Sequence, residues 1–239
     1  KKIIFWGIIA IILLPLIPDV GHFFYPFGRD VIFRIIIEII GLAYLLLVIK
    51  DRSALPKLSP LGMLIILFFA VNTLATLLSI QPQLSFWGDP LRNNGLFSHA
   101  HLVLFFFILT SLMRSLEKRR FLFILISITA LLVALTAVLQ ATFSDVTRVY
   151  GTLGNPNFLG AWILLVIFVT FSFFLKERGR IKAILGTSVF FQCAALLLTF
   201  SRGAYLGLFV GAVFFFLTLP VNSIPADAKK IIRRFAIAL

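Results

Sequence analysis

Long apolar runs separated by short polar gaps repeat along the whole chain. A helix that crosses the hydrocarbon core of a bilayer needs about 20 apolar residues, and eight of the runs meet or approach this length. We therefore expect spanning helices at about residues 3–18, 31–49, 61–80, 96–113, 121–141, 157–175, 183–200 and 204–219. The pattern predicts an all-α fold, a polytopic transmembrane helical bundle of about eight spans.

The two ends of the chain extend this pattern. Lys1 and Lys2 precede the first apolar run as in a signal peptide, but no small-residue cleavage site follows the run, so we expect a retained helix. After the eighth run come four cations and then the apolar residues 235–239, which have the composition of the start of a ninth span. We interpret residues 1–239 as a single transmembrane domain, the N-terminal part of a longer protein.

Positive charge alternates from gap to gap. All nine lysines and eight of the thirteen arginines fall in every second gap. Cytoplasmic loops of membrane proteins are enriched in Lys and Arg, so we predict that these gaps, and with them the N-terminus, are cytoplasmic. Five arginines lie in or beside the remaining, outer gaps: Arg29, Arg34, Arg92, Arg148 and Arg202. Counted this way, the inner side carries 17 basic and 4 acidic residues and the outer side five of each.

Composition narrows the class of protein. With 61% hydrophobic residues and a mean hydropathy of +1.08, the chain has too little polar surface for a soluble globular protein. The net charge of +13 arises at the inner side, where it can rest against anionic lipid headgroups, so we expect a lipid bilayer and no nucleic acid as partner. The single cysteine, Cys193, lies within an expected span, which leaves neither a disulfide framework nor a thiolate metal site.

Candidate chemistry concentrates in the outer gaps. In the segment RVYGTLGNPNFLG, Asn155, Pro156 and Asn157 have the residue types that begin a helix. A capped helix start would by itself explain them. Arg148 stands close to this helix start and to glycines that permit close backbone approach, and a cation beside a helix N-terminus can hold an anion.

A second outer segment, LLLTFSRGAYLG, joins two expected spans with almost no loop. It places Ser201 and Arg202 at the boundary of the hydrocarbon, where a cation costs free energy unless it extends toward the headgroups. Arg202 is therefore either an interfacial anchor or a functional residue. Gly207 and Gly211 have the spacing of residues that allow close helix contact.

These two segments resemble the O-antigen ligase and polymerase family of polytopic bacterial glycosyltransferases. The resemblance rests on three stretches that follow one another along the chain: SFWGDPLRNNGLF, GTLGNPNFLGAW and LLLTFSRGAYLG. The resemblance implies transfer of a glycan from a polyprenyl diphosphate carrier to a hydroxyl of a glycan, lipid or protein acceptor. The reaction would take place at the outer face of the bacterial cytoplasmic (inner) membrane, in the biosynthesis of lipopolysaccharide or a related cell-envelope polysaccharide.

The resemblance also implies roles for particular residues. Arg92, Arg148 and Arg202 would bind the diphosphate, without a metal or another cofactor. Independently of the resemblance, the residues that could support this binding are Asn155, Asn157, Ser201, Arg34 and Glu38. The family places an acceptor-activating histidine in a large later outer loop, for which these residues contain no match, so we expect the general base beyond Leu239.

Other ionisable residues leave several roles open. His22, His99 and His101 all lie near the outer side, and the spacing of two between His99 and His101 directs them to different sides of a helix, away from a shared metal. Arg34 and Glu38 are four apart and therefore neighbours on one helix face. They are expected to form a structural ion pair, or else to take part in substrate binding or an ion pathway.

Two other classes of function compete with the transferase. A transporter or flippase of lipid-linked or anionic substrates could also use membrane arginines and the Arg34–Glu38 pair. Transporters are often built from repeats with broken helices at the midplane, whereas this chain has no clear repeat and its notable polar residues cluster toward one side. A structural membrane subunit is the third possibility, and the absence of lysine among the outer cations would then be chance.

Overall fold

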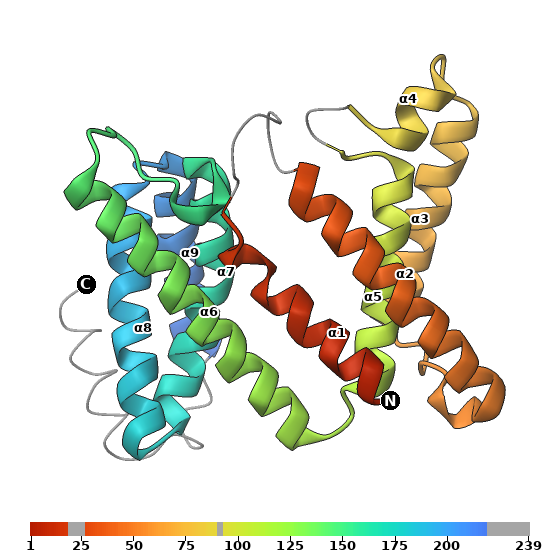
Figure 1. Cartoon of the computed structure of the whole chain (residues 1–239), viewed down its shortest axis with the longest axis horizontal. Helices are drawn as coiled ribbons and strands as arrows, with labels where there is room; N and C mark the ends of the chain where they lie inside the picture. Colours follow the sequence, from red (N-terminus) through yellow and green to blue (C-terminus); the bar gives the residue numbers. More distant parts are fainter. Residues whose placement is uncertain (19–26, 90–92, 219–239) are drawn as a thin grey trace. The chain divides into compact units, whose positions relative to one another are not determined.

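The computed structural model describes residues 1–18, 27–89 and 93–218, and these residues form α-helices, short 3-10 turns and connecting loops, with no β-strand among them (Figure 1). Arg92, His22 and the expected start of a ninth span at residues 235–239 lie outside the described residues. The chain divides into two compact units, Lys1–Arg120 and Phe121–Leu239, which we call unit 1 and unit 2.

Unit 1 contains five α-helices: α1 (Lys2–Leu13), α2 (Phe27–Lys50), α3 (Pro60–Leu77), α4 (Pro82–Trp87) and α5 (Leu96–Leu112). α2 packs against α1 and α5, and α5 packs in turn against α3 and α4. Close approach of α1 and α2 depends on Gly7, because a Cβ there would lie 2.2 Å from Cγ2 of Ile40. Ile4 and Ile8, one turn apart on α1, are fully buried.

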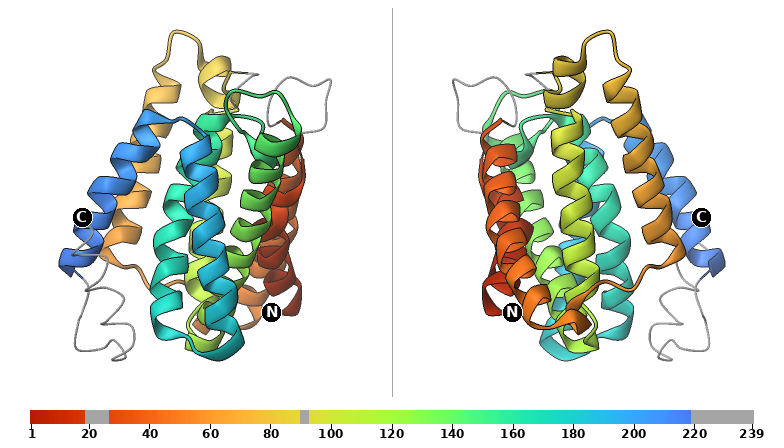
Figure 2. Two further views of the ribbon diagram at one scale, coloured as in Figure 1. Left: turned by 90° about the vertical axis from the view of Figure 1, so that its left-hand side faces the viewer. Right: turned by 90° about the vertical axis from the view of Figure 1, so that its right-hand side faces the viewer.

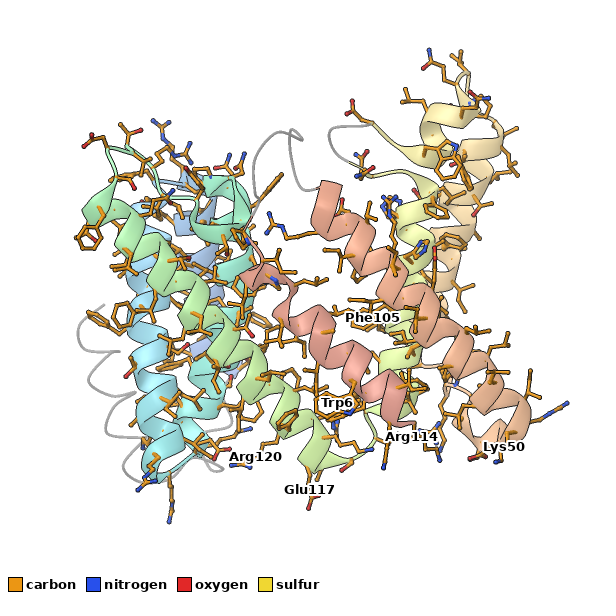
Figure 3. The ribbon with its side chains drawn as sticks, in the orientation of Figure 1. Trp6, Lys50, Phe105, Arg114, Glu117 and Arg120 are labelled. Carbon is orange, nitrogen blue, oxygen red and sulfur yellow. The ribbon has the colours of Figure 1, made fainter. Side chains whose placement is uncertain are left out.

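One end of unit 1 gathers three segments that we expected on the inner side. Nζ of Lys1 lies 3.6 Å from Oδ2 of Asp51, and Nη2 of Arg114 donates to the carbonyl of Leu55 at 2.9 Å. Figure 3 shows Lys50 and Arg114 at this end of the unit. The N-terminus, the connection between α2 and α3 and the connection after α5 therefore share one side of unit 1, as alternation of the gaps requires.

Unit 2 contains α7 (Pro156–Lys176), α8 (Gly179–Leu198), α9 (Arg202–Thr218) and all but the first turn of α6 (Leu116–Phe143). α7 packs against both α8 and α9. A Cβ at Gly207 would lie 2.5 Å from Cδ2 of Leu164, and one at Gly211 would lie 2.7 Å from the ring of Phe168. The close helix contact predicted for these two glycines is thus confirmed.

A layer of uncharged polar side chains lies inside unit 2. We name it the α6–α8 polar cluster, and it consists of Ser127, Thr170, Ser188 and Gln192, all fully buried. Nε2 of Gln192 donates to Oγ1 of Thr170 at 3.0 Å and to Oγ of Ser188 at 2.8 Å. Ser188 donates to the carbonyl of Ser127 at 2.7 Å. The cluster therefore ties α6, α7 and α8 together by side-chain hydrogen bonds.

The prediction of an all-helical membrane protein is confirmed, but the predicted number of eight spans is not. Each of the eight expected segments contains an α-helix. In the described part of the chain, five helices are long and apolar enough to cross a membrane, namely Gly28–Lys50, Pro60–Leu77, Leu116–Phe143, Pro156–Lys176 and Gly179–Leu198. The apolar helices in the other three segments, Lys2–Leu16, Leu96–Leu112 and Arg202–Thr218, are shorter. The structure thus supports a helical membrane protein with five helices of spanning length.

Two local departures have identifiable causes. α1 ends at Leu13, ahead of the expected position 18, and a 3-10 turn containing Pro15 follows. Proline has no N–H to continue an α-helix, which accounts for the early end. α4 was not expected at all, because its six residues lie in a polar gap. Pro82 begins it and Gly88, with φ of 84°, follows its last residue.

Candidate functional site

The α6–α7 connection and the α8–α9 turn meet at one end of unit 2 (Figure 2). The backbone N–H of Val149 donates to the carbonyl of Leu198 at 3.2 Å, and Val149 is buried. The two segments that carry the predicted diphosphate ligands Arg148 and Arg202 are therefore in direct contact. These connections, together with the first turns of α7 and α9, form what we call the loop site.

Arg148 is held from both sides of the loop site. Its Nε donates to the carbonyl of Thr199 at 2.8 Å, and its Nη2 donates to Oδ1 of Asn157 at 2.9 Å. The side chain is half-buried. Arginine has five N–H donors in a rigid fork, so these two contacts fix the plane of the guanidinium while further donors remain for a ligand.

Gln140 positions the loop that carries Arg148. Its Oε1 accepts from the backbone N–H groups of both Tyr150 and Gly151 at 2.9 Å. Gly151 has φ of 53°, a left-handed conformation that favours glycine, and a Cβ there would lie 3.3 Å from Cβ of Ala137. The loop is therefore pressed onto the last turns of α6. Sequence reasoning missed Gln140, although a glutamine near the end of a long apolar helix was the available signal.

The helix start predicted for residues 155–157 is confirmed, and the structure separates the roles of its two asparagines. Asn155 is the N-cap of α7, and its Oδ1 accepts from the N–H of Asn157 at 2.8 Å, with Pro156 at the first helical position. The side chain of Asn157 is then used for Arg148 instead of the cap. Asn155 builds the helix start, and Asn157 orients the cation.

Arg202 is the first residue of α9 and is exposed. Phe200, with φ of 47°, allows the tight turn before it. Ser201 supports this turn through its backbone, because its N–H donates to Oγ1 of Thr199 at 3.3 Å and its carbonyl accepts from the N–H of Tyr205 at 3.1 Å. Among the described residues Arg202 makes no hydrogen bond or ion pair, so its guanidinium is available to a ligand.

Gly160 brings the starts of α7 and α9 together. A Cβ at this position would lie 3.1 Å from Cβ of Ala204 and 3.4 Å from Oγ1 of Thr199. Helix N-termini carry partial positive charge from unpaired N–H groups. Two such N-termini and two arginines at one end of unit 2 make the loop site suited to binding an anion.

The prediction of an ion pair between Arg34 and Glu38 is wrong, because each side chain has another partner. Nη2 of Arg34 donates to Oγ of Ser98 at 2.7 Å, and the guanidinium lies 5.3 Å from the ring centroid of Phe97. Oε1 of Glu38 lies 3.2 Å from Nε2 of His101. Spacing along α2 predicted neighbours on one face, but that face meets polar partners on α5, and each charged side chain contacts α5 instead of its neighbour.

The two described histidines diverge as their spacing predicted. The ring of His99 meets the ring of Phe68 on α3, with centroids 6.1 Å apart, whereas His101 is buried against α2. Within residues 1–18, 27–89 and 93–218, no three His, Cys, Asp or Glu side chains come together as metal ligands. Gly88 and Gly95, on either side of residues 90–92, approach closely, since a Cβ at Gly95 would lie 2.3 Å from N of Gly88.

Comparisons of the chain with protein-family models, with curated proteins and with solved structures give no match. The chemistry of the loop site therefore has to be inferred from its own residues.

Proposed function

We propose that this protein is a membrane glycosyltransferase that transfers a glycan from a polyprenyl diphosphate carrier to an acceptor hydroxyl. The observation that supports this function best is the pair of hydrogen bonds from Arg148 to Thr199 and Asn157. They join the two segments that resemble O-antigen ligases and polymerases, and they orient Arg148 at the end of unit 2 where the exposed Arg202 begins α9.

The diphosphate would bind to the loop site through these two guanidinium groups. Guanidinium binds phosphate oxygens in a bidentate manner. In the proposed reaction the acceptor oxygen forms a bond to the anomeric carbon, the bond from that carbon to the diphosphate oxygen breaks, and negative charge grows on the departing diphosphate. A guanidinium already fixed in place stabilises that charge without reorganising.

The acceptor hydroxyl loses its proton in this reaction, so a general base is required. The described histidines are engaged elsewhere: His99 lies against Phe68, and both ring nitrogens of His101 have partners. Following the resemblance, we propose that the base comes from an outer loop beyond Leu239.

We further propose eight spans with a cytoplasmic N-terminus in a bacterial inner membrane, so that the loop site faces outward. The support is the alternation of cations and the gathering of Lys1, Lys50 and Arg114 at one end of unit 1. Single cysteines placed at Ser53, Ser115, Ser85 and Ser144 in a Cys193→Ser background test this. Those at Ser85 and Ser144 should react with an impermeant thiol reagent on intact cells, and the other two should not. The reverse pattern would contradict an outward loop site.

A transporter or flippase remains a second candidate because of one observation. Glu38 and His101 are ionisable residues in contact within apolar helices, as in many ion pathways. Purified protein in vesicles that moved a labelled polyprenyl diphosphate across the bilayer, without glycan transfer, would favour this candidate.

The decisive experiment uses the full-length protein reconstituted in lipid vesicles with an oligosaccharide-bearing polyprenyl diphosphate. Arg148→Ala and Arg202→Ala should each slow transfer by about 100-fold or more, the usual cost of removing one transition-state donor. Arg148→Lys should restore little of the transfer rate that Arg148→Ala loses, because lysine cannot bind phosphate in a bidentate manner. Arg180→Ala is the matched control, since Arg180 is an exposed cation at the start of α8, beside the α7–α8 connection.

Binding measurements separate the donor site from the chemical step. Long-chain polyprenyl diphosphate should bind the wild type more tightly than polyprenyl monophosphate, and this preference should disappear in both alanine variants. Wild-type transfer rates and unchanged diphosphate binding in Arg148→Ala and Arg202→Ala would remove the loop site from the mechanism.

A further inference from the structure

A second group of ionisable residues lies in unit 1, apart from the loop site. Glu38 is halfway along α2 and His101 lies in the first half of α5, with 3.2 Å between Oε1 and Nε2. The His101 side chain is only 8% exposed, whereas that of Glu38 is 60% exposed. Ionisable residues within apolar helices are costly and usually functional, and the proposed glycan transfer gives this pair no role.

The hydrogen bonds of His101 determine where its protons are. Nδ1 lies 2.7 Å from the carbonyl oxygen of Phe97. A carbonyl oxygen only accepts hydrogen bonds, so Nδ1 carries a proton. A neutral imidazole has a single N–H, and Nε2 of neutral His101 would therefore be a bare acceptor facing the carboxylate of Glu38. An ionised carboxylate is also an acceptor only.

We propose that Glu38 and His101 form a binding site for a single proton between α2 and α5. The proton lies on Nε2, giving imidazolium and carboxylate, or on Oε1, giving neutral imidazole and carboxylic acid. Both arrangements contain the same number of protons and make the same hydrogen bond. When the proton leaves, two acceptors face each other and this hydrogen bond between α2 and α5 is lost, while the one from Arg34 to Ser98 remains. The proton thus belongs to the pair and not to either residue.

Few other ionisable groups face this pair. Arg34, one turn away on α2, is directed to Ser98, and His99 on α5 is directed to Phe68. The neighbouring helices α3 and α4 have no ionisable side chain in their sequences, and α1 has only Lys2, at its first residue.

Phe97 links the proton site to the outer-side segment of unit 1. Its carbonyl accepts from His101, and its ring lies 4.6 Å from the imidazole centroid. The same ring faces the guanidinium of Arg34 and lies 5.1 Å from the ring of Trp87 in α4. Loss of the proton therefore loosens a contact next to the aromatic residues that pack the predicted outer gap.

Nitrogen NMR of the full chain, labelled at histidine and held in lipid nanodiscs, tests the proton site directly. In the wild type, Nδ1 of His101 should stay protonated from acidic to alkaline pH, while the signal of Nε2 should report loss of one proton. His99→Asn is the matched control and should leave this titration unchanged. If Nδ1 lost its proton, or if Nε2 never changed state, the proposal would be overturned.

A substitution separates the bound proton from the hydrogen bond. An amide can donate an N–H to bare Nε2, so Glu38→Gln should keep the α2–α5 contact at every pH. Spin labels at the exposed Leu42 and Leu102 would report the separation of the two helices. The wild-type distance distribution should broaden on deprotonation, and that of Glu38→Gln should not. A wild-type pH response retained in Glu38→Gln would contradict the proposal. Neither result depends on glycan transfer.

Discussion

Two polar clusters interrupt the apolar helices, and they differ in the kind of group they contain. The α6–α8 polar cluster of unit 2 has only hydroxyls and an amide, and its four residues are fully buried. In unit 1, Arg34, Glu38 and His101 with Ser98 form what we call the α2–α5 ionisable cluster, where the Glu38 side chain is 60% exposed. Uncharged groups hold helices together in one arrangement, whereas ionisable groups can change state. We infer that the first cluster is structural and the second is functional.

The largest expected effect comes from placing a charge in the uncharged cluster. Gln192→Glu should destabilise the protein by about 2.5 to 3.5 kcal/mol once the carboxyl is ionised, the cost of a charge at the centre of a bilayer. The loss should grow as pH rises, because the protonated acid still hydrogen-bonds like an amide. Unfolding in mixed micelles at two pH values measures it.

Gln83→Glu is the matched control, since Gln83 is exposed in α4, and it should leave stability unchanged. Equal stability of Gln192→Glu and Gln83→Glu would show that the α6–α8 polar cluster tolerates charge, and the contrast between the two clusters would fail.

A smaller loss is expected when a cation is removed from the ionisable cluster. Arg34→Met deletes the hydrogen bond to Ser98 and the contact with Phe97, and hydrogen bonds to charged groups contribute about 1.5 kcal/mol or more. Arg202→Met should change stability by less than about 0.5 kcal/mol, because Arg202 is exposed. The same unfolding assay compares them. A greater loss for Arg202→Met would contradict the difference in contacts between the two arginines, with Arg34 held by partners on α5 and Arg202 exposed.

Removing one hydroxyl from the uncharged cluster should cost less again. Thr170→Val keeps the shape of the side chain but deletes the acceptor for Gln192, and interhelical hydrogen bonds in membranes average about 0.6 kcal/mol. Thr110→Val is the control, since that exposed hydroxyl bonds only to carbonyls of its own helix. A double-mutant cycle of Thr170→Val with Gln192→Leu should show coupling, and additive losses would argue against a connected cluster.

The smallest change in stability is expected at Asp51, a charged residue outside both clusters. The hydroxyl of Ser53, with its backbone N–H, donates to Asp51 and holds the pKa of that carboxyl below its usual value. A lowered pKa in the folded state means that the stabilisation is present above the usual pKa and is lost as pH falls through the lowered one. Ser53→Ala should therefore lower the melting temperature slightly near neutral pH, and the difference should vanish in acid. A difference that grew in acid would contradict this assignment.

Sequence patterns predicted the helices well because apolar length is a local property. For the same reason they predicted the N-cap of α7 at Asn155 and the close helix contact at Gly207 and Gly211. The prediction of an Arg34–Glu38 ion pair failed because the spacing of residues along α2 does not reveal which polar partners lie on α5. Contacts such as Arg148 with Thr199 join residues 51 apart, and only the resemblance suggested that the two segments belong together.

The residues that sequence reasoning missed have polar roles set by distant partners. Gln140 and Gln192 are each a single amide in an apolar helix. Nothing in the local sequence shows that Gln140 bonds to a loop whereas Gln192 bonds to side chains within the α6–α8 polar cluster. His101 was one of three equivalent candidates until burial and its two hydrogen bonds distinguished it. The transferase activity and the outward orientation stay predictions.

The glycines between α7 and α9 restrict how these helices can move. Gly160 of α7 faces Ala204, while Gly207 and Gly211 of α9 face Leu164 and Phe168. The large side chains of Leu164 and Phe168 thus fit against the two glycines of α9, and sliding one helix along the other would make side chains clash. If the starts of α7 and α9 separate when a ligand binds, we therefore expect the two helices to tilt apart and not to slide along each other.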